Sequence, residues 1–151
     1  MTDIILTEYN EADFKELLDM SMDLFQNYPP EEIERGLRAN LKKITHTTFI
    51  AKHLGRSIGF ITVSIRSDYV EGSKSSPVGY LEAIYVNSGF RERGVAKQLY
   101  EQGEFWISQK GCTEIGSDTW DWNLDAQKFH SKLGFKKDDV LVHYIKEIKD
   151  K

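Results

Sequence analysis

The chain has 151 residues, of which 40% are hydrophobic and 29% are charged, a composition typical of a globular protein with one sizeable core. Its 20 Lys and Arg residues against 24 Asp and Glu residues give a net charge of −4, which argues against a nucleic-acid partner and is compatible with a cationic ligand. Cys112 is the only cysteine, which excludes an internal disulfide and a cysteine-rich zinc site, and no metal is expected.

The first half of the chain is predicted to hold two helices between strands. Asn10 is placed to cap the first helix, and Pro30 suits the first turn of the second. In chain order the expected elements are a strand over Ile4–Glu8, a helix from Glu11 with apolar positions Phe14, Leu17, Leu18, Met22 and Phe25, a helix over Pro30–Leu41, and a hairpin of Thr47–Lys52 and Ser57–Ile65 around Gly55.

The second half is predicted to alternate strands with helices after a polar connection over residues 67–78. Its expected elements are strand Gly79–Val86, helix Gly94–Lys110, strand Glu114–Asp118, helix Asn123–Leu133 and a final strand Val140–Ile148. Helix crossovers between these strands predict an α/β fold. Its sheet is expected to be mixed, with parallel and antiparallel strands as in α+β folds, and to be covered by helices. No repeat, low-complexity tract or linker divides the sequence, so residues 1–151 are expected to form a single domain.

The sequence carries no recognisable export or membrane signal. No apolar run approaches about 20 residues, the length needed to cross a bilayer. The opening MTDIILTEYN also lacks the basic start of a signal peptide. We therefore expect a cytoplasmic protein with no membrane partner.

The segment Tyr85–Leu99 (YVNSGFRERGVAKQL) joins the end of an apolar strand to a helix through a polar turn. Arg91, Gly94 and Ala96 stand there in the spacing R-x-x-G-x-A. Free backbone N–H groups and the positive end of a helix dipole meet at such a position and bind phosphate. The segment therefore predicts a site for a phosphorylated cofactor, without a Walker lysine motif or a dinucleotide fingerprint. The alternative is an ordinary loop before a helix, with Arg91 and Arg93 in solvent.

This strand, turn and helix, together with NLDAQKFHSKLGF at Asn123–Phe135, resemble the acetyl-CoA-binding half of the GNAT N-acetyltransferase superfamily. Within it the chain is similar to the aminoglycoside 6′-N-acetyltransferases, whose pattern combines S/R-x-D-Y-V-x-G, S-S-P-V, L-E-x-I-Y, S-D-T and L-G-F. The corresponding residues lie in the ranges 67–77, 81–85, 117–119 and 133–135. The resemblance implies the GNAT fold, a central twisted mixed sheet flanked by about four helices, with acetyl-CoA as co-substrate.

The same resemblance assigns residues to the cofactor. The N–H groups of the turn would bind the pyrophosphate, the backbone of Ile84–Val86 would pair with the acetyl oxygen and the pantetheine amides, and the helix after Asn123 would lie along the pantetheine arm. A plain N-cap is a compatible role for Asn123. The predicted cofactor-binding residues are Ile84, Tyr85, Val86, Arg91, Glu92, Arg93, Gly94, Val95, Ala96, Lys97, Asn123, Ala126 and Phe129.

Acetyl transfer to an amine requires an acceptor for the amine proton, and Glu82 and Asp118 are the candidates. By alternation Glu82 shares one side of an apolar strand with Tyr80, Ile84 and Val86, a costly place for a carboxylate unless it is used or paired. The resemblance implies that Asp118 of the S-D-T motif contacts the substrate amine, which makes it the first choice. A partnered core glutamate and a turn-capping aspartate are the alternatives, and a water chain could also carry the proton.

The departing thiolate also requires a proton, and here the sequence departs from the superfamily. Many members carry Tyr at the helix position that His130 fills here. Histidine donates a proton near neutral pH more readily than tyrosine does. His130 is therefore a third catalytic candidate, with packing beside the cofactor as the alternative.

Acidic and aromatic residues gather in the loops on either side of the predicted cofactor strand. Carboxylates pair with ammonium groups and aromatic faces attract cations, so this mixture suits a polycation that also has sugar rings. The predicted substrate-binding residues are Phe25, Tyr69, Glu71, Glu82, Asp118, Trp120 and Asp121. Solvated acids, a helix cap at Asp121 or Asn123, and core or dimer contacts for the tryptophans are the alternatives.

Three functions follow from these patterns. The leading one is transfer of an acetyl group from acetyl-CoA to the 6′-amine of aminoglycosides, by direct attack in a ternary complex, giving antibiotic resistance. The second is a GNAT enzyme acting on a polyamine or on a protein lysine or N-terminus. The third is a binding module without chemistry, against which the joint presence of Glu82 and Asp118 counts. By analogy with the family a homodimer is expected, with Val140–Ile148, including His143 and Tyr144, pairing across its interface.

Overall fold

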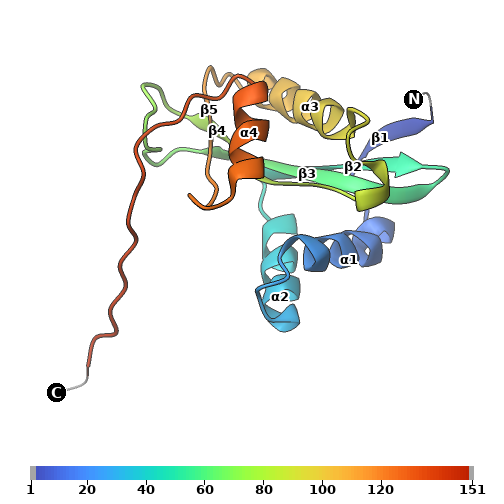
Figure 1. The fold of residues 1–151 in the computed structure, drawn as a ribbon, viewed down its shortest axis with the longest axis horizontal. Helices are drawn as coiled ribbons and strands as arrows, with labels where there is room; N and C mark the ends of the chain where they lie inside the picture. Colours follow the sequence, from blue (N-terminus) through green and yellow to red (C-terminus); the bar gives the residue numbers. More distant parts are fainter. Residues whose placement is uncertain (1–2, 150–151) are drawn as a thin grey trace. The chain divides into compact units, whose positions relative to one another are not determined.

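The computed structural model describes residues 3–149. The chain divides into two compact units, the first ending at Asp118 and the second beginning at Thr119. The first unit holds a five-stranded sheet in the order β1-β2-β3-β4-β5 (Figure 1), formed by Ile4–Glu8, His46–His53, Arg56–Arg66, Val78–Val86 and Ile115–Ser117. The first four strands pair antiparallel, and β5 joins β4 in parallel. The mixed sheet predicted from the sequence is therefore confirmed.

The hairpin between β2 and β3 turns at Leu54 and Gly55, whose φ angles are 50° and 81°. Two successive left-handed residues give a turn whose twist matches that of antiparallel strands. The predicted turn at Gly55 is confirmed, and each strand is one residue longer at either end than predicted.

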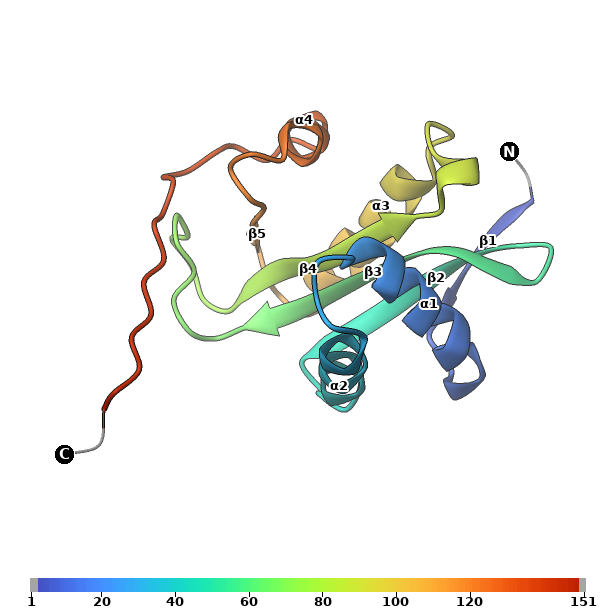
Figure 2. The same cartoon turned by 60° about the horizontal axis from the view of Figure 1, so that its bottom comes forward.

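Helices cover both faces of this sheet (Figure 2). The helices α1, Phe14–Leu24, and α2, Pro30–Leu41, lie on one face, and α3, Val95–Gln109, lies on the other. On the α1 face the centre of the core is a cluster of buried side chains, formed by Leu17, Met20, Ile50, Phe60 and Tyr85. Apolar burial of this kind is the main term that stabilises such a fold.

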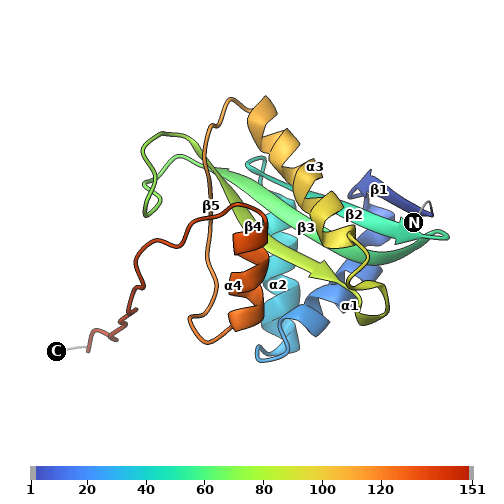
Figure 3. The ribbon, with the colours of Figure 1, turned by 45° about the horizontal axis from the view of Figure 1, so that its top comes forward.

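On its own face α3 approaches the sheet so closely that two positions require glycine. A Cβ at Gly79 of β4 would lie 2.3 Å from Cγ2 of Ile107, and a Cβ at Gly103 would lie 2.9 Å from Cγ1 of Val63. Figure 3 shows the loop that leads from the end of β4 into α3. Close packing therefore holds the middle and the last turns of α3 against β3 and the start of β4.

The first helix starts with a capping box, as Asn10 predicts. The Oδ1 of Asn10 accepts a hydrogen bond from the N–H of Ala12 at 3.0 Å, and the carboxylate of Asp13 accepts one from the N–H of Asn10 at 2.9 Å. A 3-10 turn over Glu11–Asp13 precedes α1. The buried positions of α1 are Leu17, Met20 and Ser21. Placing Phe25 in the apolar stripe is wrong, because α1 ends at Leu24 and the Phe25 side chain is 37% exposed.

The pleat of β4 changes phase at Glu82. The register pairs Ala83 with Thr62 and Leu81 with Val63, so Glu82 is an extra residue in β4. One extra residue in one strand of an antiparallel pair is a β-bulge, which bends the strand and re-aims its side chains.

The bulge corrects the side-chain alternation expected from the sequence. Beyond it Ile84 pairs with Ile61, whose side chain would lie 3.0 Å from a Cβ at Gly103 of α3. Ile84 and, by alternation, Val86 therefore point to the α3 face, away from Glu82. The expectation that these residues share one face with Glu82 is wrong, because an extra residue shifts the period-two pattern by one.

The second unit contains α4, Leu124–Lys132, which begins at Asn123. The Oδ1 of Asn123 accepts a hydrogen bond from the N–H of Ala126 at 3.1 Å, so this residue is an N-cap. Gly134, with φ of 94°, follows the end of the helix, in agreement with the predicted end at Leu133.

The predicted strand Val140–Ile148 is wrong for the structure described over residues 3–149. This segment forms no strand, and its side chains are exposed, reaching 90% at Tyr144 and 100% at Ile145. A strand is defined by hydrogen bonds to a neighbour, and alternating apolar residues give the propensity without supplying that neighbour. Over the same described range, none of the helices is both long enough and apolar enough to cross a membrane.

Candidate functional site

The edge of β4 beyond Leu81 is open in the described sheet. The register of β5 pairs it with β4 at Gly79, Tyr80 and Leu81, and β4 then continues to Val86 alongside β3. Backbone groups of Ile84–Val86 on the β5 side thus have no strand to pair with among these residues. This is the geometry that the expected contacts with an acetyl oxygen and with pantetheine amides require.

The turn after β4 holds two left-handed residues, Glu92 with φ of 62° and Gly94 with φ of 80°. The first helical hydrogen bond of α3 runs from the N–H of Gln98 to the Gly94 carbonyl at 3.1 Å. The N–H groups of Val95, Ala96 and Lys97 therefore stand at the open end of the helix. The first turn of α3 carries no acidic residue that would oppose an anion. Such a concave set of amides at a helix start fits a phosphate group.

Arg91 ties this turn back to the strand. Its Nε donates a hydrogen bond to the Val86 carbonyl at 2.7 Å, and its guanidinium lies 5.8 Å from the centre of the Tyr85 ring. The guanidinium of Arg93 lies 5.6 Å from the ring of Phe90. Both arginines therefore help to shape the turn, and their predicted contact with a cofactor phosphate stays a prediction.

Glu82 is surrounded by hydrogen-bond donors. Arg66 donates from Nη2 to Oε1 at 2.9 Å and from Nε to Oε2 at 3.1 Å, a forked pairing. The hydroxyl of Ser64 also donates to Oε2, and Nε2 of His46 lies 4.0 Å from the same oxygen. Glu82 is therefore a partnered glutamate, which is the alternative that the sequence left open.

Asp118 follows β5 and connects to the same group of side chains. Its Oδ2 accepts a hydrogen bond from the hydroxyl of Tyr80. The guanidinium of Arg66 lies 3.4 Å from the centre of the Tyr80 ring, close enough for a cation–π contact. We call Ser64, Arg66, Tyr80, Glu82 and Asp118 the carboxylate network. The network brings together the two carboxylates that the sequence singled out.

Burial and charge shift the proton affinities around the network. Burial, together with the hydrogen bond to Asp118, raises the pKa of Tyr80, so its hydroxyl remains a donor in neutral solution. Burial lowers the pKa of His46 despite the nearby Glu82 carboxylate. Burial alone would lower the pKa of Arg66, but its hydrogen bonds to Glu82 outweigh this and the pKa is raised. The guanidinium therefore stays charged.

Tyr85 joins the end of β4 to α1. Its hydroxyl donates a hydrogen bond to Asp23, and burial and that carboxylate raise the pKa of Tyr85 to about 12. Two residues after Asp23, the ring of Phe25 packs edge to face against the ring of Tyr28, with 6.2 Å between the ring centres. Both rings are partly exposed, as an aromatic wall for a ligand requires, and the substrate role of Phe25 stays a prediction.

The polar connection before β4 is anchored by Glu114. Its Oε1 accepts hydrogen bonds from the N–H of Lys74, at 2.9 Å, and from the hydroxyl of Ser75. Tyr69 is 73% exposed, and its hydroxyl accepts a hydrogen bond from Gly72 at 3.4 Å. Glu71 is exposed as well. The structure leaves both side chains accessible, and their contact with substrate stays a prediction.

The remaining predicted residues belong to the second unit. Trp120 is 58% exposed, Asp121 is exposed, and Ala126 and Phe129 are half-buried. The Nδ1 of His130 lies 2.7 Å from the Ala126 carbonyl, and its ring lies 5.2 Å from that of Phe135. These contacts agree with the packing alternative for His130, and its role as an acid stays a prediction.

Arg66, Ser64 and Tyr80 are parts of the site that the sequence did not predict. Ser64 and Arg66 are polar at alternate positions of an otherwise apolar strand, which places both on one face. Arg66 also occupies the first position of the motif S/R-x-D-Y-V-x-G. Their meeting with Glu82 depends on the cross-strand register and its bulge, which one sequence does not reveal.

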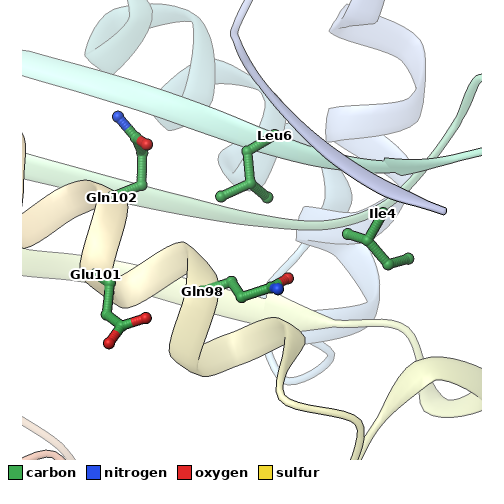
Figure 4. A pocket seen from close by; sticks show the side chains of 5 residues that line it. All are labelled: Ile4, Leu6, Gln98, Glu101 and Gln102. Atoms are coloured by element: carbon green, nitrogen blue, oxygen red, sulfur yellow. The ribbon is translucent and has the colours of Figure 1, made fainter. Parts of the chain in front are cut away.

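A separate hollow of ≈ 340 Å³ lies between β1 and α3 (Figure 4). Its lining consists of Ile4, Leu6, Gln98, Glu101 and Gln102. None of the predicted site residues lines it, so the hollow is not the candidate site.

The chain belongs to the acetyltransferase (GNAT) family, which it matches over residues 9–135. The family resemblance and the GNAT fold expected from the sequence are thereby confirmed, and the protein is an acetyltransferase. The match extends across the boundary between the two compact units.

The chain is similar to named members of this family. It is 36% identical over 146 residues to aminoglycoside N(6′)-acetyltransferase type 1 of Serratia marcescens, covering 96% of this chain and 99% of that protein. It is 48% identical over 99 residues to the Salmonella typhimurium protein of the same name, covering 66% of this chain and 68% of that protein.

Solved structures of related enzymes have the same fold. AAC(6′)-Iy in complex with the bisubstrate analog CoA-S-monomethyl-acetylneamine matches with a TM-score of 0.88 and 36% identity, covering 96% of this chain and 99% of that one. Apo AAC(6′)-IG from Acinetobacter haemolyticus matches with a TM-score of 0.89 and 30% identity, with the same coverage.

Replacing Gly94 by valine is expected to raise the KM for acetyl-CoA about fivefold or more. A branched side chain is strained at a φ of 80°, and relief of this strain moves the N–H groups at the start of α3. Initial rates at varied acetyl-CoA concentration measure the KM. Gly111→Val is the matched control, since Gly111 has φ of 84° and lies just beyond the other end of α3. An unchanged KM in the Gly94 variant, or an equal rise in both, would contradict a phosphate site in this turn.

Proposed function

We propose that this acetyltransferase moves an acetyl group from acetyl-CoA to the 6′-amine of aminoglycosides by direct attack in a ternary complex, and so gives resistance to these antibiotics. The observation that carries the proposal is similarity at 36% identity, over nearly the whole chain, to an enzyme named for this reaction. A second support is the complex of AAC(6′)-Iy with an analog that joins CoA to an acetylneamine.

The open amides support the donor half of the reaction. Acetyl-CoA supplies the acetyl group as a thioester. The N–H groups at the start of α3 bind its pyrophosphate, and the open edge of β4 at Ile84–Val86 hydrogen-bonds its carbonyl and amide groups. Asn123, Ala126 and Phe129 remain proposed contacts of the pantetheine arm, on the family resemblance.

The carboxylate network supports the acceptor half. Asp118 binds the acceptor ammonium and takes its proton, directly or through water, so that a neutral amine attacks the thioester carbon. A C–N bond forms, the C–S bond breaks, the nitrogen loses its second proton to water, and the thiolate takes up a proton from water or from His130. Tyr69, Glu71, Trp120, Asp121 and Phe25 are the proposed walls for the rest of the acceptor. Glu82 acts beside Asp118 within the same network.

A polyamine, a protein lysine or a protein N-terminus is the alternative class of acceptor. A peptide acceptor requires strand edges that pair with its backbone, whereas a polycation requires acidic loops. The exposed Glu71 and Asp121 favour the polycation. The use of acetyl-CoA and the net charge of −4 support a cytoplasmic enzyme with a small cationic amine, rather than nucleic acid, as its partner.

We propose that both compact units act as one acetyltransferase domain, because the family match runs continuously across their boundary. We also propose a homodimer in which Val140–Ile148 pairs across the interface. The support is the row of exposed apolar side chains in this segment, which an isolated chain leaves in water.

The acceptor position is tested with two aminoglycosides that differ only in a 6′-amine or a 6′-hydroxyl. We expect thiol release from acetyl-CoA with the amine alone, since the hydroxyl is a far weaker nucleophile at neutral pH. Release of coenzyme A is followed with a thiol reagent. Absence of turnover with either compound would refute the proposed substrate.

Asp118→Asn is expected to lower kcat/KM for the acceptor about 100-fold, the usual effect of losing a proton acceptor or an ion-pairing group at a reacting amine. The same thiol assay measures it. Asp19→Asn is the control, because Asp19 is an exposed aspartate on α1 whose partner is Lys15 at 3.7 Å. Wild-type rates in Asp118→Asn would remove Asp118 from the mechanism.

The dimer is tested by replacing Ile145, which is fully exposed in the single chain, with glutamate. A charge buried in an apolar interface destabilises it, so we expect a dimer for the wild-type protein and a monomer for the variant. Light scattering during size-exclusion chromatography gives both molar masses. A monomeric wild-type protein would overturn this proposal.

A further inference from the structure

Two carboxylates of the first unit, one in β4 and one directly after β5, are linked through one cation. Glu82 lies in the bulge of β4, and Asp118 directly follows β5. Arg66, the last residue of β3, contacts Glu82 through its hydrogen bonds and reaches toward Asp118 through the ring of Tyr80. The two carboxylates consequently have different surroundings.

Glu82 is fully engaged by the protein itself. Both of its oxygens accept hydrogen bonds from Arg66, and one also accepts the Ser64 hydroxyl. Its side chain is only 20% exposed. A carboxylate held in this way contributes a compensated charge and offers little to an incoming ammonium group.

Asp118 differs from Glu82 in both respects. It is exposed, and its hydrogen bond comes from a neutral phenol. The charges of one guanidinium and two carboxylates add up to −1, and this excess negative charge lies at Asp118. The network therefore has the charge needed to bind one ammonium group.

The position of Asp118 depends on Tyr80. The strand before Asp118 has three residues, and its pairing with β4 ends at Ser117, so Asp118 lies outside the strand pairing that holds β5. The Tyr80 hydroxyl supplies the restraint, and the Arg66 guanidinium, 3.4 Å from the ring centre, restrains Tyr80.

We propose that Arg66 is a positioning residue of this enzyme: it compensates Glu82 and, by holding the Tyr80 ring, fixes Asp118 as the one carboxylate of the pair that receives the acceptor's ammonium group. This inference rests on the proposed function, because it concerns the acceptor of that reaction. Arg66 acts through Tyr80 and Glu82, without contact to the reacting atoms.

The proposal predicts that Arg66→Gln lowers kcat without raising the KM for the acceptor. Removal of the guanidinium changes the network charge from about −1 to about −2, so a cationic acceptor still binds and its KM does not rise. The kcat falls about 10- to 100-fold, because a carboxylate displaced by about 1 Å no longer meets the amine correctly. The KM for acetyl-CoA remains within about twofold of the wild-type value.

Two further variants separate charge from geometry. Arg66→Lys keeps the charge without the planar fork, so it recovers part of the lost kcat. Tyr80→Phe keeps the ring and removes the hydroxyl, so it lowers kcat without changing the acceptor KM. In the double variant Arg66→Gln/Tyr80→Phe the combined loss is smaller than the product of the single losses, because both changes release the same carboxylate.

Arg38→Gln is the matched control. Arg38 likewise pairs with a glutamate, Glu34 at 2.8 Å, and lies 4.2 Å from an aromatic ring centre, that of Phe14, but it stands on α2 outside the network. We expect wild-type kcat and KM for this variant. Circular dichroism of every variant gives the folded fraction by which each kcat is corrected.

An Arg66→Gln enzyme with a corrected kcat within about twofold of wild type would overturn the inference, as would a raised acceptor KM with unchanged kcat. If Arg66→Gln does not fold, Arg66→Lys and Tyr80→Phe decide, and an unchanged kcat in Tyr80→Phe overturns the inference. A wild-type protein without turnover on any aminoglycoside overturns the proposed function itself. An active wild type with an unaffected Arg66→Gln variant overturns only the role of Arg66.

Discussion

A carboxylate inside a β-sheet must be compensated, and the candidate site of this protein is arranged around that constraint. Moving Glu82 out of water without partners would cost several kcal/mol, so the neighbouring strand supplies Arg66 and Ser64. The bulge at Glu82 places Ile84 and Val86 on the α3 face of the sheet, opposite to the face of the Glu82 side chain. One local irregularity thus lets β4 serve the site on one side and the core beneath α3 on the other.

The electrostatics of the site follow from the same pairing. The cation that compensates Glu82 also lies on the ring of Tyr80, and Tyr80 donates its hydroxyl hydrogen to Asp118. The oxygens of Glu82 are therefore hydrogen-bonded within the protein, whereas Asp118 is exposed and carries the excess negative charge. An enzyme that acetylates a polycationic amine requires an anionic site with one accessible carboxylate, so this difference agrees with the proposed acceptor.

The donor half of the site depends on backbone geometry rather than on charged side chains. The left-handed residues Glu92 and Gly94 turn the chain so that the N–H groups of the first turn of α3 have no carbonyl partner. The end of β4 extends beyond the residues that pair with β5, so its backbone edge is open there. Arg91 uses its side chain to hold this turn against Val86. Backbone amides recognise phosphate and carbonyl groups whatever the neighbouring side chains are, so the proposed cofactor contacts place few demands on the side chains of this turn.

The sequence by itself determined most elements of the fold and the family, and it predicts the donor site, because periodicity, caps at Asn10 and Asn123, and the R-x-x-G-x-A spacing act over a few residues. It also identified Glu82 and Asp118 as the carboxylates of interest. It failed for the strand Val140–Ile148, which requires a neighbour, and for the face of Ile84, which the bulge reverses. Only the tertiary structure decided that Arg66 and Tyr80 join the two carboxylates, because residues from three strands meet there through a cross-strand register that is a property of the sheet and not of any one segment.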